Sequence, residues 1–427
     1  MSSHALRRRL RGGCIALLAA LIAAPLSAAD KNEFRLKDAA AAASCRNDVK
    51  APPARTHEAA DAIKVLPSDR GIYAGVYSIG TTRADIAEFK RKTQQPPAIV
   101  FSFHDWVIDD EVMKSNPTLR DLNAEMEDKG ISALELARQV SKDGGVLALT
   151  WALQCCEFSS YAWWFGLKEA EVTVPKVLRG EYDEYIRRVA RQAKSLGSPI
   201  MLSLFAEFNW QGAFAFGKDG TSAISRVDDI CGQYGDPAWP DGPERIRDVH
   251  RHVIDIFRNE GVKNVTWFMY ANSGYMDPKA KDFSPWLHPR FFYPGDEYMD
   301  WVGQSAYFVD PKWTQVVSKD ASTIDRALGA GYAAWGEVTQ RPIFLPEFGP
   351  VGDMKVNRSA VLDNVMTHVL PSMPRVRAVT LADFLIAEIC CQMPRLGNPH
   401  TEEIDTWRRA VGGNPAYVFR PKTGAPK

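Results

Sequence analysis

Residues 184–205, EYIRRVARQAKSLGSPIMLSLF, place a helical pattern directly before a buried strand. In the first part, apolar residues recur every three or four positions, and Gly197 provides a signal for the end of a helix. The second part, Ile200 to Phe205, is apolar almost throughout, which is typical of a strand covered on both faces. A helix followed by such a strand is the repeating unit of a parallel α/β sheet.

The same pattern recurs along the chain from Gly71 onward. Apolar or β-branched runs predict strands at Gly71–Ile79, Ala98–Phe103, Val146–Trp151, Ile200–Phe205, Val265–Met269, Trp301–Ala306, Ile343–Leu345 and Val376–Leu381. Helical patterns lie at 133–142, 184–195, 245–259 and 360–369. Eight such units favour a single (β/α)8 TIM barrel, with long loops at its C-terminal face, over an open doubly wound sheet. No glycine-rich phosphate loop follows the first predicted strand, so no cofactor is expected.

The composition is that of a globular protein, and its charge balance favours an uncharged binding partner. Lys plus Arg and Asp plus Glu both number 52, so the formal net charge is zero. A neutral chain offers no broad electrostatic surface for nucleic acid or an anionic membrane. Aromatic residues make up 11 % of the chain, which suits a surface that stacks on ring-shaped ligands.

The N-terminus has the order of a secretory signal peptide, which we assign to residues 1–29. Four arginines between positions 7 and 11 precede an apolar segment, and Ser27-Ala28-Ala29 supply the small residues before a cleavage site. We expect cleavage after Ala29 and a secreted or periplasmic protein, with an uncleaved signal anchor as the alternative. Residues 30–70 are expected to form a weakly ordered segment or a packing arm, and residues 71–427 a single barrel domain.

Six cysteines would remain after cleavage, an even number in a compartment that permits disulfides. They are Cys45, Cys155, Cys156, Cys231, Cys390 and Cys391. The sequence alone cannot choose among the possible pairings. We expect at least one disulfide close to the C-terminal face of the barrel, with free buried thiols as the alternative.

Polar and aromatic side chains at the C-terminal ends of the predicted strands are the candidates for chemistry, because active sites of (β/α)8 barrels lie at that face. They are His104, Asp105, Trp106, Trp151, Glu207, Asn209, Asn272, Tyr307, Glu347 and Asp383. Glu207 and Glu347 stand out, because two carboxylates that face each other can hydrolyse an acetal. One protonates the departing oxygen while the other attacks the anomeric carbon or activates water. A structural ion pair is the alternative interpretation of each glutamate.

Five segments resemble, in order, the motifs of glycoside hydrolase family 26, a retaining β-mannanase family. Residues 199–210, PIMLSLFAEFNW, resemble its strand-four motif, and 241–253, 256–267, 293–307 and 341–349 resemble the motifs that follow. The resemblance covers residues 71–384. It implies that Glu207 is the acid/base, that Glu347 is the nucleophile and that Tyr307 lies near the nucleophile.

The chain departs from the family pattern at the site itself. Ala206 stands where the family usually has histidine, Ser203-Leu204 replaces its Arg-Pro, and Ala152 replaces a histidine after the third strand. Both carboxylates are kept while groups that bind sugars are changed. These departures predict weak or absent activity on plain β-1,4-mannan and a better substrate among other β-linked or decorated polymers.

Further residues at the strand ends are expected to bind the substrate. The candidates for stacking on sugar rings are Trp106, Trp151 and Trp210, and those for polar contacts are His104, Asn209 and Tyr307. Packing beneath long loops is the alternative for each tryptophan. The His104-Asp105 pair lacks the spaced ligand set of a zinc site, so no metal is expected.

Two function classes follow from this sequence. The first is a secreted retaining glycoside hydrolase that cleaves a β-linked polysaccharide, mannan-like or a related exopolysaccharide, with two glutamates. The alternative is a non-hydrolytic carbohydrate-binding or exopolysaccharide-assembly accessory on the same fold, which Ala152 and Ala206 would permit. The two retained glutamates favour the hydrolase, with a polysaccharide or oligosaccharide as partner and without nucleic acid or stable membrane insertion.

Overall fold

The eight predicted strands form a closed parallel barrel. The computed structural model describes residues 57–77, 82–107, 118–126, 130–153, 174–209, 234, 239–278, 285–309, 321–351, 358–382 and 405–425. The barrel strands are β2 (Ile72–Tyr77), β3 (Ile99–Phe103), β4 (Val146–Thr150), β5 (Ile200–Ser203), β6 (Val265–Asn272), β7 (Trp301–Val309), β8 (Ile343–Val351) and β9 (Val376–Ala382). Each is parallel to the next, and pairing of β2 with β9 closes the sheet. The predicted (β/α)8 barrel is therefore confirmed.

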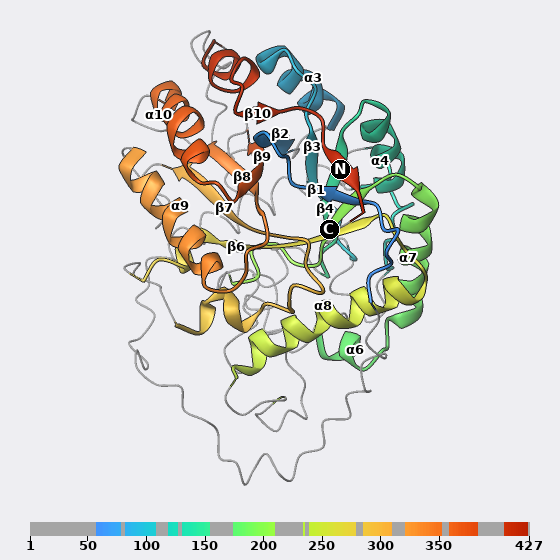
Figure 1. Ribbon diagram of the computed structural model, residues 1–427. Helices are drawn as coiled ribbons and strands as arrows, with labels where there is room; N and C mark the ends of the chain where they lie inside the picture. Colours follow the sequence, from blue (N-terminus) through green and yellow to red (C-terminus); the bar gives the residue numbers. More distant parts are fainter. Residues whose placement is uncertain are drawn as a thin grey trace, which may run out of the picture.

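Helices lie around the outside of the strands (Figure 1). They are α3 (Thr82–Thr93), α4 (Ala133–Lys142), α6 (Val174–Leu178), α7 (Asp183–Leu196), α8 (Asp241–Asn259), α9 (Ala321–Gly336) and α10 (Arg358–Asn364). Shorter helical turns are η1 (Ser273–Tyr275), η2 (Pro285–Leu287), η3 (Pro289–Phe291), η4 (Val365–Val369), η5 (Leu370–Ser372) and η7 (Arg408–Gly412). No helix in the described ranges combines the length and the apolar character needed to cross a bilayer.

Local sequence signals account for the limits of the predicted helices. The hydroxyl of Ser132 accepts a hydrogen bond from the backbone N–H of Glu135, which caps the first turn of α4. Helix α7 ends at Gly197, whose φ of 72° lies in the left-handed region that glycine adopts without strain. The apolar face of α7 is buried, so its periodicity reflects packing against the barrel.

Aromatic rings fill the interior of the barrel. Phe101, Phe268 and Phe344 come from three different strands, and their ring centroids lie 5.3 to 6.3 Å apart. Tyr270 follows Phe268 by two residues and lies nearer the C-terminal end of β6, where its ring contacts Phe101 at 6.0 Å. All four side chains are fully buried. The strands thus surround a packed core, and side chains at the C-terminal ends of the strands lie on top of this core.

Residues 64–66, in the arm before Gly71, pair with a strand close to the C-terminus. Strand β1 (Lys64–Leu66) pairs antiparallel with β11 (Lys422–Gly424), and β10 (Tyr417–Val418) extends the sheet beside β2. The indole Nε1 of Trp301, at the start of β7, donates a hydrogen bond to Val65 O at 2.8 Å. The arm therefore covers the N-terminal end of the barrel. The expected signal peptide and all six cysteines lie outside the described residues.

A buried lysine fastens this arm to the barrel. Lys64 is only 2 % exposed, and its Nζ lies 2.9 Å from Glu58 Oε2 and 3.1 Å from Asp300 Oδ2. The same ammonium donates to Val265 O at 2.6 Å. A buried ammonium is tolerated only with such partners, because removing it from water is costly.

Replacing Lys64 with methionine should lower the free energy of unfolding by about 2 to 3 kcal/mol, because Asp300 and Glu58 lose their shared cation. Urea denaturation measures this change. Lys263→Met is the matched control, since Lys263 is 48 % exposed and pairs with the exposed Asp61. The control should change stability by less than about 1 kcal/mol. Equal losses in the two variants would contradict the role of Lys64.

Candidate active site

The predicted acid/base, Glu207, lies four residues beyond β5 in a strained backbone conformation. Its φ is 42°, a left-handed value that residues other than glycine rarely adopt. Its carboxylate is buried, and Oε1 accepts a hydrogen bond from the hydroxyl of Ser305. The side chain of Asn272 donates a second hydrogen bond to the carboxylate. Backbone strain of this kind is typical of functional positions, where the surrounding structure holds a side chain in one orientation.

Burial raises the pKa of Glu207, and this effect exceeds the lowering by the hydrogen bonds from Ser305 and Asn272. A raised pKa favours the protonated form. The carboxyl is thus suited to donate a proton at a pH where an ordinary glutamate is ionised.

The predicted nucleophile, Glu347, lies within β8, whereas the sequence pattern predicted the end of that strand at Leu345. The pairing of β8 with β9 shifts its register between Leu345 and Phe348. Such an irregularity re-aims side chains without ending the strand. The Glu347 carboxylate is buried, and its Oε1 accepts a hydrogen bond from the Tyr270 hydroxyl at 2.7 Å.

Tyr270 connects the two carboxylates electrostatically. Burial raises the pKa of its phenol well above 10, and the negative charge of Glu347 adds to this effect. A smaller contribution comes from Glu207, so both carboxylates lie close enough to act on the same hydroxyl. Thr150, the last residue of β4, lies 3.3 Å from the phenol oxygen. The ends of β4, β5, β6 and β8 thus converge on one buried polar site.

Asn209 fastens the segment that carries Glu207 to the end of β6. Its side-chain Nδ2 donates to Asn272 O at 3.2 Å, and its Oδ1 accepts from Asn272 N at 2.6 Å. Asn272 Oδ1 in turn accepts from Gly274 N at 2.9 Å, which leaves the amide NH2 of Asn272 to face Glu207. Asn209 is buried, and its side-chain amide makes both of these hydrogen bonds to the backbone of Asn272. The structure therefore gives it a positioning role where a sugar contact was expected.

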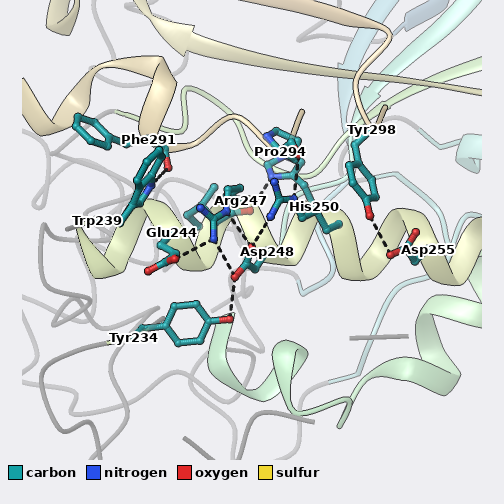
Figure 2. Close-up of polar contacts among 12 residues, drawn as sticks. Tyr234, Trp239, Glu244, Arg247, Asp248, His250, Asp255, Phe291, Pro294 and Tyr298 are labelled. Carbon is teal, nitrogen blue, oxygen red and sulfur yellow. Dashed lines mark hydrogen bonds and ion pairs between the residues drawn. The ribbon is translucent and has the colours of Figure 1, made fainter. Parts of the chain in front are cut away.

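A polar network on α8 supports the rim of the same face (Figure 2). Arg247 donates to Glu244 Oε1 and to Asp248 Oδ1, both at 2.9 Å. The Tyr234 hydroxyl also donates to Asp248, at 3.1 Å, and the guanidinium of Arg247 lies over the ring of Trp239. These residues lie on the first turns of α8, the helix that follows β5 in the chain, or just before it.

The family model for glycosyl hydrolase family 26 matches residues 75–327. The chain belongs to this family. A curated relative, endoglucanase H of Acetivibrio thermocellus, is 27 % identical over 216 residues, which are 50 % of this chain and 19 % of the relative. The match therefore spans about a fifth of that relative's length.

Solved structures of family 26 mannanases share the fold. The Cellulomonas fimi endo-β-1,4-mannanase double mutant matches with a TM-score of 0.53 and 15 % identity, over 82 % of this chain and 72 % of that one. The catalytic domain of the Bacillus sp. JAMB-750 endo-β-1,4-mannanase matches with a TM-score of 0.52 and 15 % identity, over 82 % and 88 %. At this identity the likeness establishes the barrel and leaves the substrate open.

Trp106 and Trp151 are packing residues in this family 26 barrel, contrary to the expectation that they stack on sugars. Both side chains are 0 % exposed, and their ring centroids lie 4.8 Å apart. The indole Nε1 of Trp151 donates to the hydroxyl of Tyr185 on α7 at 3.2 Å. A fully buried indole offers no face to a ligand, so these rings join the barrel to its helical layer.

His104 presents a single hydrogen-bond acceptor near the end of β3. Its Nε2 lies 2.9 Å from Asp121 O, so this nitrogen carries the proton and donates it to the carbonyl. Burial lowers the pKa of His104 to about 4, and the positive charge of Arg120 acts in the same direction. The ring is therefore neutral, and Nδ1 has no hydrogen-bond partner among the described residues. An unprotonated Nδ1 can accept a hydrogen bond.

The remaining predicted site residues are only partly covered. Tyr307 lies in β7 opposite Gly349 of β8, which places it beside the strand that carries Glu347. Its side chain and the whole of Trp210 lie outside the described residues. In the parts of the chain that are described, no group of three or more His, Cys, Asp or Glu side chains could hold a metal ion.

Sequence reasoning missed Tyr270, Ser305 and Thr150. The predicted strand around Val265 ended at Met269, so the next residue was counted neither as strand nor as a polar strand end. Ser305 and Thr150 lie inside predicted strands and were counted with the core. Their signal is a hydroxyl-bearing residue near the C-terminal end of a barrel strand, on the inward-facing side.

The neutral buried histidines should make this protein less stable in mild acid. Burial lowers the pKa of His104 and of His250 to about 4, whereas an unfolded histidine titrates near 6.5. Between these values the unfolded chain binds more protons, so acidification favours unfolding. Each histidine should cost about 2 kcal/mol between pH 7 and pH 5.

The variant His250→Phe tests this prediction, because the His250 ring packs 5.3 Å from that of Phe205 and makes one backbone hydrogen bond, to Ile246 O. Urea unfolding at pH 7 and pH 5 should show a pH-dependent loss about 2 kcal/mol smaller than in the wild type. Identical losses in the two proteins would show that His250 does not contribute.

Proposed function

We propose that this member of glycosyl hydrolase family 26 is a retaining glycoside hydrolase that cleaves a β-linked polysaccharide outside the cytoplasm. The observation that carries the proposal is the pair of buried carboxylates in unlike surroundings. Glu207 has its pKa raised by burial, whereas Glu347 accepts a charge-assisted hydrogen bond from a tyrosine. Two carboxyl groups whose environments separate their protonation states fit an acid and a nucleophile.

In the proposed mechanism Glu207 protonates the glycosidic oxygen while Glu347 attacks the anomeric carbon. The bond to the leaving group breaks, and a covalent glycosyl-enzyme forms with an ester to Glu347. Glu207, now ionised, removes a proton from a water molecule whose oxygen attacks the anomeric carbon on the face from which the first leaving group departed. The ester bond to Glu347 breaks as the new bond forms, which releases the Glu347 carboxylate and leaves Glu207 protonated again. Two inversions return the original configuration.

The proposed substrate is mannan-like or a related exopolysaccharide, with weak activity on unsubstituted β-1,4-mannan. Ala152 and Ala206 are buried and carry no hydrogen-bond donor where the family usually has histidines. The hydroxyl of Ser203 donates inward to Phe205 O at 3.0 Å and does not replace the missing arginine. Export rests on the signal-peptide pattern of residues 1–29.

A substrate panel tests the proposal. The purified protein is incubated with mannans, substituted mannans, xylans and mixed-linkage glucans, and released reducing ends are measured. Activity on at least one β-linked polymer, with the β-anomer of the product formed first by ¹H NMR, would support the retaining hydrolase. Formation of the α-anomer first would reject retention.

A second candidate function is a non-hydrolytic carbohydrate-binding or exopolysaccharide-assembly accessory, which the two alanines at histidine positions favour. Binding of a glycan without hydrolysis, measured by calorimetry on the same panel, would support this candidate over the enzyme.

A further inference from the structure

We infer that Tyr270 is a positioning residue for the nucleophile, whose hydroxyl holds the Glu347 carboxylate in one orientation and in its ionised form. The inference deepens the proposed function and rests on it, because it assigns Glu347 the attacking role. It concerns a strand-β6 residue that neither the sequence pattern nor the family resemblance singled out.

The ring of Tyr270 is held firmly. It stacks on Phe268 with an interplanar angle of 18° at 6.1 Å, and it meets Phe101 edge-on at 6.0 Å and 88°. The side chain is fully buried, so its rotation is blocked on both sides. The hydroxyl therefore has a fixed location at the base of the site, and the Glu347 carboxylate is oriented by its hydrogen bond to this hydroxyl.

The hydrogen bonds around this hydroxyl have one consistent direction. A phenol has a single proton, and an ionised carboxylate can only accept, so Tyr270 donates to Glu347 Oε1 across 2.7 Å. Thr150 Oγ1, at 3.3 Å, can then donate to the phenol oxygen. The raised pKa of Tyr270 keeps the phenol protonated at neutral pH, so its proton is available for this bond.

This arrangement has two effects on the nucleophile. A hydrogen bond to the ionised form of a carboxyl favours that form, which opposes the desolvation that acts on buried Glu347. It also fixes which carboxylate oxygen faces the phenol, because Oε1 accepts the Tyr270 bond, and we assign the attack to Oε2. Charge-assisted bonds of this kind are about twice as strong as neutral ones.

The test compares Tyr270→Phe with a matched control, Tyr73→Phe. Tyr73 is also a fully buried barrel tyrosine, and its hydroxyl bonds Leu66 O at 2.9 Å and Lys422 N at 2.8 Å, at the opposite end of the barrel. The Glu347 carboxyl is titrated by ¹³C NMR of glutamate-labelled protein, with its resonance assigned by its absence in Glu347→Gln. We expect its pKa to rise by about one unit in Tyr270→Phe and to stay unchanged in Tyr73→Phe.

Kinetics give a second readout. In Tyr270→Phe, kcat/KM on the best substrate should fall about 10- to 100-fold, with the acid limb of the pH profile moved to higher pH and KM little changed. Tyr73→Phe should keep the wild-type profile. Thr150→Val removes only the hydroxyl that lies 3.3 Å from the phenol oxygen, so it should raise the Glu347 pKa by less than Tyr270→Phe does. If Tyr270→Phe fails to fold, the titration of Thr150→Val tests the inference in its place.

The outcomes separate this inference from the proposed function. An unchanged Glu347 pKa in both Tyr270→Phe and Thr150→Val would overturn the role of Tyr270, whatever the activity. A wild-type protein that hydrolyses no glycan of the panel would overturn the proposed function, while the NMR titration would still decide whether Tyr270 controls the ionisation of Glu347.

Discussion

Replacing Glu347 with glutamine should lower kcat on the order of 10⁵-fold, because an amide cannot form the glycosyl ester. The fold should be retained, since the amide oxygen of glutamine can still accept the hydrogen bond from Tyr270. Initial rates on an aryl β-glycoside and on the best polysaccharide measure the loss. Glu337→Gln is the control, because Glu337 is an exposed glutamate that pairs with His288 at 3.3 Å.

A trapping experiment identifies the attacked residue directly. A 2-deoxy-2-fluoro glycoside with a good leaving group slows breakdown of the covalent intermediate, so mass spectrometry of the wild type should find the sugar on the peptide that contains Glu347. The label should be absent from Glu347→Gln. Rapid hydrolysis by this variant, or a label on another residue, would refute the assignment of the nucleophile.

Replacing Glu207 with alanine should lower kcat about 10²- to 10⁴-fold on a polysaccharide, whose leaving group needs a proton. The loss should be far smaller in the bond-breaking step for an aryl glycoside with an acidic leaving group, because such a group departs without protonation. Single-turnover rates on a series of aryl glycosides measure this difference. Equal losses across the series would show that Glu207 is not the acid.

The pH profile of the same variant provides a further measurement. Burial raises the pKa of Glu207, so its protonated form persists above the usual range of a glutamate, and activity should fall only as the pH rises through this raised value. This basic limb should disappear in Glu207→Ala, since the titrating acid is gone. Persistence of the limb would assign it to another group.

The barrel could be predicted from the sequence because parallel strands that are buried on both faces consist of continuous runs of apolar residues. The four helices with a clear apolar periodicity were also found. Helices α3 and α9 were not, since α3 is rich in charged residues and α9 is rich in alanine and glycine. Their helical form depends more on packing against the barrel than on local pattern.

The two carboxylates of the candidate site could be singled out from the sequence, whereas their hydrogen-bond partners could not. Glu207 and Glu347 follow or interrupt apolar runs, where a charged residue is conspicuous. Trp106 and Trp151 were assigned to the substrate because a tryptophan that packs on a neighbour has the same sequence signal as one that stacks on a sugar. The two hydrogen bonds of the Asn209 side chain could not be predicted either, since they go to backbone groups whose positions no side-chain pattern reveals.

The pairing of β1 with β11 has a consequence for how the enzyme can be presented to an insoluble substrate. Both strands lie at the N-terminal end of the barrel, where β1 contacts the first residues of β6 and β7. Glu207 and Glu347 lie at the opposite end. A support or a second protein attached just beyond Gly424 would therefore hold the molecule by its N-terminal face, and the candidate active site would point away from the attachment and toward the polymer.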